Sequence, residues 1–451
     1  MTALDVAEAA LRHAAGDDAE AIVHAERSGL ARFAASSIHQ PTLIDDVLVQ
    51  LTVLRDGRLG VATTNRIDDG SLAELARRAR DVADSASPDD DLPLLAPPAE
   101  LPAVDGFDEE TASLDPAEQA SLAARAIAAT PAASAYGFFT SGEVELAIAS
   151  TSGLEAVQRF TDATLLVIAA AEDASGYAER TSWRVGEIDP TAVAREAAEK
   201  AGRTRGAGEL EPGRYAAVLE PYAVSDLLQY FSYDVFSGLA LLEERSFFAD
   251  RLGEKVFDGK ISIADDSLDP QGLPKAFDFE GTPKRRVELV ESGIARGVVW
   301  DRRTAARAGT ESTGHALSAR DRGLGPLPLA LSVSAGDAES VEELAELVGD
   351  GIYITRLHYV NVVSPRDGVL TGMTRDGTFR IRDGKIGKPL VNLRFTVAVP
   401  ELLADVPGLT RARLLVNQSD FYDERYPTAA LVPALATAAF HVTGTGSRPG
   451  I

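Results

Sequence analysis

The stretch RYAAVLEPYAVSDLLQYFSYDVFSGLALLEERSFF spans residues 214–248 and decides the fold expected for the second half of the chain. Residues 214–221 predict a strand. Residues 223–248 predict a long helical segment, because apolar side chains return every three or four residues. The preceding segment, TRGAGELEPG at 204–213, is polar and rich in glycine. This composition is typical of a connection between compact units, so we place the main domain boundary there.

After the long helical segment, strands and glycine turns dominate the sequence. VELVESGIARGVVW at 287–300 predicts a hairpin. TFRIRDGKIGKPL at 378–390 predicts a second hairpin, which turns at Asp383-Gly384. Residues 206–451 therefore predict a β-rich C-terminal domain that contains one long helix.

The first half mixes helices and strands, and we expect residues 1–205 to form an N-terminal α/β sandwich-like domain. Ser71 is the expected N-cap of a helix at 71–86, and Asp56-Gly57 is a strong turn signal inside a hairpin at 47–64. The expected fold class is thus α+β with two domains divided at 205/206. The other expected elements are helices at 3–15 and 190–200, strands at 21–26 and 29–36, and a meander at 143–185.

The charge balance excludes some classes of partner. The 451 residues carry 44 Lys and Arg against 69 Asp and Glu, a net charge of −25. Binding to nucleic acid or to an anionic membrane needs clustered cations, so this balance argues against both. No cysteine is present, which excludes disulfides, thiolate ligands and cysteine nucleophiles. The N-terminus lacks the pattern of a signal peptide, and no run of about 18 apolar residues occurs, so we expect a cytoplasmic protein without a membrane span.

The six histidines show no HxH or HxxxH spacing, so they predict no metal site. His39 follows an expected strand and is assigned a surface or packing role. His315 lies in a glycine-containing loop, where ligands often bind, and His358 lies in an expected strand as a core or cleft residue. The acidic run DDSLD at 265–269 lacks the full order of a calcium loop, and we expect an exposed turn there.

Five strings, two in the first half and three in the second, occur in an order and at a spacing that resemble the TldD/PmbA family of peptidase-related proteins. Each string is weak alone, but together they cover nearly the whole chain. They are LARFAASSIHQ (30–40), RDGRLGVATTN (55–65), RLGEKVFDGKISIADDSLDP (251–270), FDFEGTPKRRVELVESGIARGVVWDRRTAARAG (277–309) and STGHA (312–316).

This resemblance implies a two-domain subunit that pairs through large interfaces. In catalytic members of the family it implies a metal-dependent peptidase that acts on extended or unfolded peptides. Those members carry an HExxxH motif on the long helix and use a late cysteine as a further ligand. Counting back without a gap from the GEKV string at 253–256 places the motif on residues 229–234. Gln229 and Asp234 then stand at the two histidines, and Tyr230 stands at the glutamate.

The residues at these positions do not supply the chemistry of the motif. Zinc catalysis needs several good ligands and an open position for water. The amide of Gln229 is a poor ligand, Asp234 offers one carboxylate, and the chain has no cysteine. A phenol such as that of Tyr230, with a pKa of about 10, does not take a proton from water at neutral pH. We therefore predict no catalytic residue, metal or cofactor in this chain, and zinc only in a catalytic partner.

Three functions stay open. The first is a non-catalytic subunit of a TldD/TldE-like metallopeptidase, paired with a catalytic TldD-like subunit or with itself, that acts on peptides. The second is a divergent hydrolase active in its own right, and the third is a stand-alone module that binds a peptide or protein. Loss of the motif favours the first and third, and the family-like strings in both halves favour the first by analogy.

The aromatic helix also bears on assembly. Phe231, Tyr233 and Phe236 cannot all point to one face at about 100° per residue. Some of them must therefore meet a second surface, either in the same chain or in a partner.

Overall fold

The computed structural model describes residues 1–419, 421 and 424–450. Over these residues the chain forms a mixed α+β fold with two sheets, one of six strands and one of eleven. We call them the N-terminal sheet and the C-terminal sheet. They confirm the predicted α+β class, with a helix-covered sheet first and a strand-rich part second. The division into domains at 205/206 stays a prediction.

The N-terminal sheet is antiparallel throughout and consists of long hairpins. Its strands are β1 (Asp18–Ala34), β2 (Ser37–Arg55), β3 (Arg58–Thr64), β4 (Ser134–Ser150), β5 (Glu155–Ala171) and β6 (Ala174–Ser182). Their spatial order is β3-β2-β1-β4-β5-β6. The chain turns from β2 to β3 at Asp56 and Gly57, whose φ angles are both positive, 49° and 71°. An Asp-Gly pair favours this two-residue turn, as predicted.

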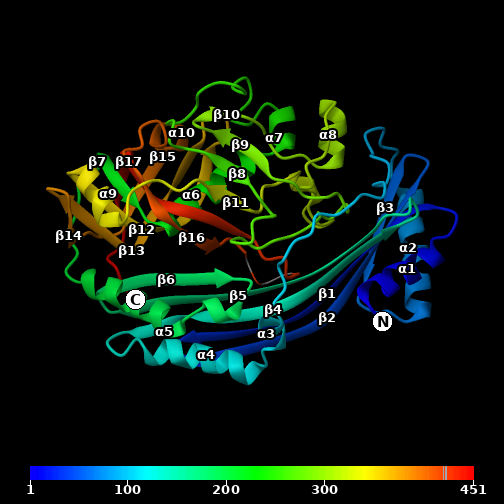
Figure 1. Cartoon of the computed structure of the whole chain (residues 1–451), viewed down its shortest axis with the longest axis horizontal. Helices are drawn as coiled ribbons and strands as arrows, with labels where there is room; N and C mark the ends of the chain where they lie inside the picture. The colour runs from blue at the N-terminus through cyan, green and yellow to red at the C-terminus, as the bar shows by residue number, and fades with distance from the viewer. Residues whose placement is uncertain (420, 422–423, 451) are drawn as a thin grey trace.

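Helices cover one face of this sheet (Figure 1). They are α1 (Ala3–His13), α2 (Asp69–Ser85), α3 (Glu109–Ser113), α4 (Pro116–Ala128) and α5 (Pro190–Arg203). Buried residues of α1 and α2, such as Ala7 and Leu72, form one core with the sheet, and buried residues of α4 and α5, such as Ala123 and Ala194, form another. Small side chains on these helices allow close packing against the strands.

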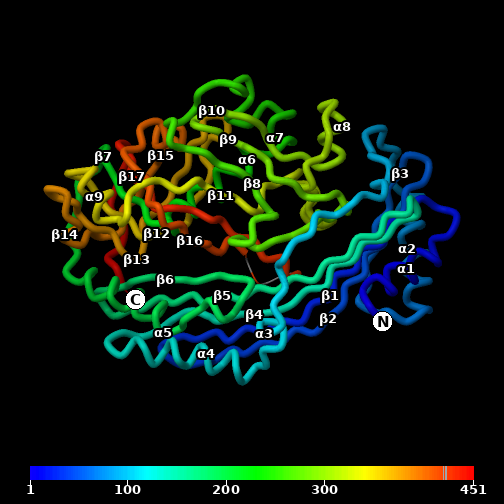
Figure 2. Tube along the Cα trace, in the orientation of Figure 1, coloured from blue at the N-terminus to red at the C-terminus, as the bar shows by residue number. Residues whose placement is uncertain are grey.

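The other face of the N-terminal sheet meets the C-terminal part of the chain. Because side chains alternate along a strand, Ala21 and Val23 of β1 join the core under the helices, whereas Ile22 joins a core on the opposite face. That second core also contains Phe277 and Phe279. Figure 2 shows the long strands curving beneath the C-terminal layer. One core therefore holds residues from both halves of the chain.

The C-terminal sheet is mixed, and its longest strand pairs with four others. Its strands are β7 (Gly213–Leu219), β8 (Ile263–Asp265), β9 (Val287–Glu291), β10 (Ile294–Ala295), β11 (Leu331–Val333), β12 (Gly351–Ser364), β13 (Val369–Arg382), β14 (Lys385–Pro389), β15 (Leu393–Ala398), β16 (Leu409–Asn417) and β17 (Ala429–Thr445). β17 pairs antiparallel with β7, β15 and β16 and parallel with β11. The two predicted hairpins are β9–β10 and β13–β14.

The long helical segment expected at 223–248 is interrupted. The helices of this part are α6 (Pro221–Val235), α7 (Gly238–Leu242), α8 (Arg302–Ala308), α9 (Val341–Val348) and α10 (Val399–Leu402), with short 3-10 turns at Val185–Glu187 and Arg322–Leu324. α6 ends at Val235, and a Cβ on Gly238 would lie 2.3 Å from the Trp300 ring, so only glycine allows this close approach. No helix among the described residues combines the length and apolar character needed to span a membrane.

Two local predictions for the first half are wrong. The strands expected at 21–26 and 29–36 are one strand, β1, because β2 and β4 pair with it on both sides through the polar residues Arg27 and Ser28. The N-cap of α2 is Asp68 instead of Ser71. The Asp68 carboxylate accepts the main-chain N–H of Ser71 at 3.0 Å.

Arg425, between β16 and β17, forms hydrogen bonds and an ion pair with strands of the N-terminal sheet. Arg425 is 5% exposed, and its guanidinium donates to both carboxylate oxygens of Asp162 on β5 at 2.7 Å. It also donates to Thr140 Oγ1 on β4 at 3.1 Å, and the Arg425 main-chain N–H donates to Glu26 Oε2 on β1 at 3.0 Å. Breaking one partner of a buried pair is costly. These contacts therefore hold the chain at Arg425 firmly against the N-terminal sheet.

Candidate functional site

The three positions singled out in the sequence, Gln229, Tyr230 and Asp234, lie in the second half of α6. The helix begins with Pro221, whose fixed φ suits the first helical position. Residues four apart share a helix face, so Gln229 lies beside Tyr233.

Gln229 is held by its own chain. Its Nε2 donates to the main-chain oxygen of Gln418 and to the hydroxyl of Tyr233, both at 3.1 Å. The Gln418 side chain in turn donates to Ser225 Oγ on α6 at 3.1 Å. The start of the β16–β17 connection therefore lies against this face of the helix.

Tyr230 is half-buried and packs edge-to-face on Tyr233, with ring centroids 6.2 Å apart. Burial, together with the nearby Asp226, raises the pKa of the Tyr230 phenol. The phenol is therefore protonated at neutral pH and cannot serve as a general base there.

Asp234 forms an ion pair with Arg245. The same guanidinium donates through Nε to Glu243 at 2.7 Å. Arg245 thus bridges two carboxylates at the end of α6, and the Asp234 carboxylate is used within the chain.

Asp234, Glu243 and Arg245 line a pocket of about 620 Å³, whereas Gln229 and Tyr230 do not. Its wall combines apolar surface with charge: Phe279, Leu327 and Tyr426 contribute apolar surface. The charged groups among its described lining residues are four carboxylates and two guanidinium groups, namely Asp234, Glu243, Asp321, Glu424, Arg245 and Arg320. The volume lies in the range of small-ligand sites.

The donor set does not fit a zinc centre. Zinc takes thiolate, imidazole or carboxylate ligands, and of the three positions only Asp234 offers one of these. That carboxylate already pairs with Arg245. Within residues 1–419, 421 and 424–450, no three His, Asp or Glu side chains converge closely enough to hold a metal ion.

Comparison with known proteins decides the family. Models of three domains of PmbA/TldA metallopeptidases match the chain: domain 1 over residues 19–83, the central domain over 109–205 and the C-terminal domain over 212–444. The chain belongs to the PmbA/TldD metallopeptidase family. The resemblance noted in the sequence is confirmed, and α6 lies in the part that matches the C-terminal domain of this family.

Relatives agree with this assignment. A metalloprotease of Methanothermobacter thermautotrophicus is 26% identical over 379 residues, which are 80% of each chain. The crystal structure of TldE from Thermococcus kodakarensis has a TM-score of 0.86 at 20% identity and covers 98% of this chain and 99% of that one. A Thermotoga maritima protein described as a putative modulator of a DNA gyrase has a TM-score of 0.84 at 18% identity, with 97% and 98% covered. The two structures establish a shared fold.

One histidine of this PmbA/TldD member belongs to a buried hydrogen-bond chain. His315 Nε2 lies 2.9 Å from Asp265 Oδ1, and His315 Nδ1 lies 2.9 Å from Thr313 Oγ1. Burial, then Lys284, lowers the pKa of His315. All three side chains are buried, so the exposed acidic turn predicted at 265–269 is wrong for Asp265. None of the three lines the pocket at the end of α6.

The other two histidines discussed above lie apart from this pocket. His39 is exposed within β2, not after a strand. His358 is half-buried on β12 and packs on Tyr359 with ring centroids 4.1 Å apart. Burial, together with Arg356 and Arg375, lowers the pKa of His358 to about 4.

Sequence reasoning missed the charged residues around the pocket. Glu243 and Arg245 belong to the quoted helical stretch, but their sequence pattern suggests only a solvated helix face. Asp321 and Glu424 come from distant loops. No local signal in the sequence identifies these residues, because the pocket forms only when the helix end packs against distant loops.

Proposed function

We propose that this chain is the non-catalytic subunit of a two-subunit metallopeptidase. Its partner is a relative that carries the intact HExxxH motif, and the complex acts on extended or unfolded peptides. The observation that carries the proposal is the set of residues at 229, 230 and 234. An amide, a protonated phenol and a paired carboxylate replace two ligands and a base.

The contacts of these residues support this view. Gln229 and Asp234 each bind another group of the same chain, so the helix end is integrated into the fold. Family membership supplies the peptidase context, and the TldE-like fold extends over nearly the whole chain. A subunit that retains the family architecture without its metal ligands suits a supporting role.

The pocket at the end of α6 is the proposed place for a peptide segment. Apolar side chains such as Phe279 and Leu327 suit a side chain of the peptide, and the charged rim suits its polar backbone and termini. Extended peptides are recognised by such a combination of apolar pockets and polar contacts.

Assembly is part of the proposal. Phe231 and Phe236 lie in the core of their own chain, 1% and 0% exposed, whereas Tyr233 is 37% exposed. Among the aromatic residues of α6, Tyr233 and the half-buried Tyr230 therefore reach the surface, where a partner would cover them. We propose a dimer with the catalytic relative, or with a second copy when that relative is absent.

An independent hydrolase is the competing function, and the Thr313–His315–Asp265 chain is the observation that would favour it. A hydroxyl, an imidazole and a carboxylate in series resemble an activated nucleophile. However, Thr313 Oγ1 also bonds to the main chain of Trp300, accepting its N–H at 2.7 Å. Because the three side chains are buried and do not line the pocket, we assign them to the structure of the loop.

The test is reconstitution with the HExxxH-bearing relative from the same genome. The chain alone is expected to leave an unfolded peptide intact. The mixture is expected to cleave it, to stop when a chelator is added, and to show a heterodimer mass by light scattering. A 47.7 kDa monomer that is unchanged by the relative would refute the subunit proposal and leave the binding module. Cleavage by the chain alone, abolished by Asp234→Ala or Thr313→Val, would establish the independent hydrolase.

A further inference from the structure

A second pocket, of about 800 Å³, lies between the connector that precedes β7 and the β13–β14 hairpin. The proposed function does not use it. Four basic side chains line it: Arg380, Arg382, Lys385 and Lys388. Two acidic residues, Glu209 and Glu211, lie on the connector side. In a chain with a net charge of −25, such a concentration of cations needs an explanation.

The basic side chains of this pocket are largely without partners. In the described part of the chain, Arg380, Lys385 and Lys388 form no ion pair, and no ion pair joins them to Glu209 or Glu211. Arg382 pairs only with Asp350, at 3.7 Å, and both side chains are largely exposed. The lining residues carry four cationic groups against two carboxylates, and the cations in excess repel each other. An anion in the pocket would relieve this repulsion.

Arg380 is the strongest evidence that this pocket binds a ligand. Its Nε and Nη1 atoms are buried and have no hydrogen-bond partner among the described residues. Buried polar groups are nearly always satisfied, so an orphaned guanidinium points to a missing ligand, ion or water. The guanidinium lies 5.3 Å from the centre of the Tyr215 ring, within cation–π range.

Hydrogen bonds fix the wall of the pocket that lies opposite the cations. The Tyr215 hydroxyl donates to the main-chain oxygen of Glu211 at 2.7 Å. The main chain of Gly208 forms two hydrogen bonds at the end of β14. Its N–H donates to the Pro389 oxygen at 3.0 Å, and its oxygen accepts the Val391 N–H at 2.9 Å. The connector is therefore tied to the hairpin, and Leu210 and Leu390 add apolar surface between them. The pocket is thus a formed recess with cationic and apolar walls.

We propose that this pocket binds a small molecule that carries an oxyanion, a phosphate or a carboxylate, on an apolar or aromatic body. A guanidinium matches the geometry of both oxyanions, Lys385 and Lys388 add charge at the rim, and Tyr215 with the two leucines contacts the body. The proposal does not depend on the peptidase role.

The test is calorimetric titration of the full chain in low-salt buffer with phenyl phosphate, benzoate and inorganic phosphate, and with benzyl alcohol as the uncharged comparison. We expect saturable binding of at least one aromatic anion, at one site per chain, that weakens with added salt. The phosphate and carboxylate probes separate the two sources of the oxyanion. Tighter binding of phenyl phosphate than of inorganic phosphate would confirm a contribution from the apolar walls.

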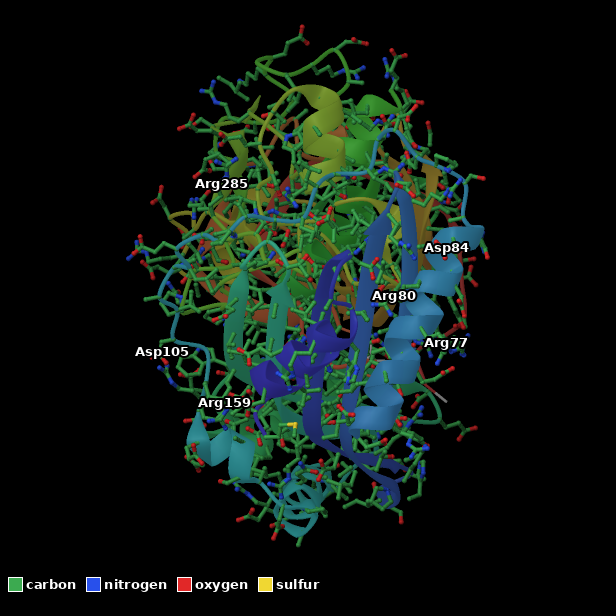
Figure 3. All side chains as sticks on the ribbon, turned by 90° about the vertical axis from the view of Figure 1, so that its right-hand side faces the viewer. Arg77, Arg80, Asp84, Asp105, Arg159 and Arg285 are labelled. Atoms are coloured by element: carbon green, nitrogen blue, oxygen red, sulfur yellow. The ribbon has the colours of Figure 1, made fainter. Side chains whose placement is uncertain are left out.

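Matched variants locate the site. Arg380→Gln is expected to weaken binding about tenfold or more. Lys385→Ala with Lys388→Ala, two exposed positions whose replacement does not disturb the core, is expected to weaken it by a smaller factor. The control is Lys255→Ala with Arg285→Ala, which changes the net charge equally at exposed positions outside the pocket, where Arg285 lies at the surface (Figure 3). Absence of saturable binding at millimolar anion, or equal weakening by the control pair, would overturn the proposal.

Discussion

The two halves of α6 differ in how they are bound to the rest of the molecule. In the first half, the Tyr222 hydroxyl accepts from Arg180 at 2.9 Å and bonds to Glu196 at 3.1 Å, both in the N-terminal layer. Asp226, which is partly buried, accepts the main-chain N–H of Leu357 at 2.8 Å. In the second half, Asp234 lines an open pocket and pairs with Arg245, and Gln229 donates to Tyr233, which lines the same pocket.

Along this one helix, the residues that stabilise the fold are therefore separate from the residues at the motif positions. Buried polar networks are costly to disturb because each lost partner leaves a desolvated group. Contacts between partly exposed side chains such as Asp234 and Arg245 contribute less, since water can replace them. The motif positions can therefore change without loss of the fold, whereas the first half of α6 constrains both layers.

The largest effect is expected from Glu220→Ala, at the N-cap of α6. Glu220 is 5% exposed and accepts from Lys200 Nζ at 2.6 Å, from the Tyr353 hydroxyl and from Thr355 Oγ1 at 3.0 Å. Removing the carboxylate leaves Lys200 and two hydroxyl groups without this buried acceptor. The free energy of unfolding should fall by about 3 kcal/mol or more, as measured by denaturant titration.

Glu401→Ala is the matched control for this prediction, because it removes the same group from an exposed pair with Arg214, 4.0 Å apart. It should change the free energy of unfolding by less than about 0.5 kcal/mol. Equal losses in the two variants would contradict the assignment of a structural role to the buried half.

The next effect concerns pH. Burial raises the pKa of Asp226 to about 7 from its ordinary value of 3.8. Between these values the folded chain holds a proton that the unfolded chain has lost, so the stability from this group is full at low pH and is lost as pH rises through 7. Asp226→Asn keeps an oxygen for the Leu357 N–H and removes the titration.

Thermal midpoints of the wild type and Asp226→Asn, measured from pH 5 to pH 8, provide the test. The thermal midpoint of the variant should rise relative to that of the wild type as pH rises, by several degrees across this range. Burial also raises the pKa of Glu20 to about 7, with no contribution from Asp226, so Glu20 acts equally in both proteins. Burial raises the pKa of Glu179 to about 7 as well, and the charge of Asp226 adds to that rise, so part of the gain of the variant comes through Glu179. A constant difference between the two proteins would show that Asp226 stays ionised in the folded chain.

Much of the fold was predictable because local signals and tertiary structure agree. The Asp56-Gly57 turn, the helix that begins at Pro190 and the β13–β14 hairpin all follow from turn and cap residues. The strand break predicted near Arg27 failed, because its polar character is offset by pairing on both sides of β1. The end of α6 at Val235 depends on the contact of Gly238 with Trp300, 62 residues later in the chain, which no local pattern contains.

The candidate site was only partly predictable. The spacing from the GEKV string placed Gln229, Tyr230 and Asp234 on a helix, and they lie on α6. The groups that bind them come from elsewhere: Gln418 follows β16, and Arg245 follows α7. Such contacts arise from tertiary packing, so their residue types carry no local signature.

A smaller effect is expected from Asp234→Ala, in the second half of α6. The Asp234 and Arg245 side chains are 21% and 35% exposed, and Arg245 keeps Glu243 as a partner. A partly exposed pair of this kind contributes at most about 1 kcal/mol. The thermal midpoint should fall by no more than about 4 °C, and a loss as large as that of Glu220→Ala would remove the contrast between the two halves.

The smallest effect is expected from Tyr230→Phe, and the same change at Tyr222 gives the sharpest form of the comparison. Each substitution deletes one hydroxyl from the same helix. The Tyr230 hydroxyl has no hydrogen bond among the described residues, so its loss should leave the thermal midpoint and any cleavage by the reconstituted complex unchanged. The Tyr222 hydroxyl bonds to Arg180 and Glu196 across the two layers, and its loss should cost about 1–3 kcal/mol. Reduced cleavage in Tyr230→Phe at unchanged stability would instead assign that phenol a part in the peptidase reaction.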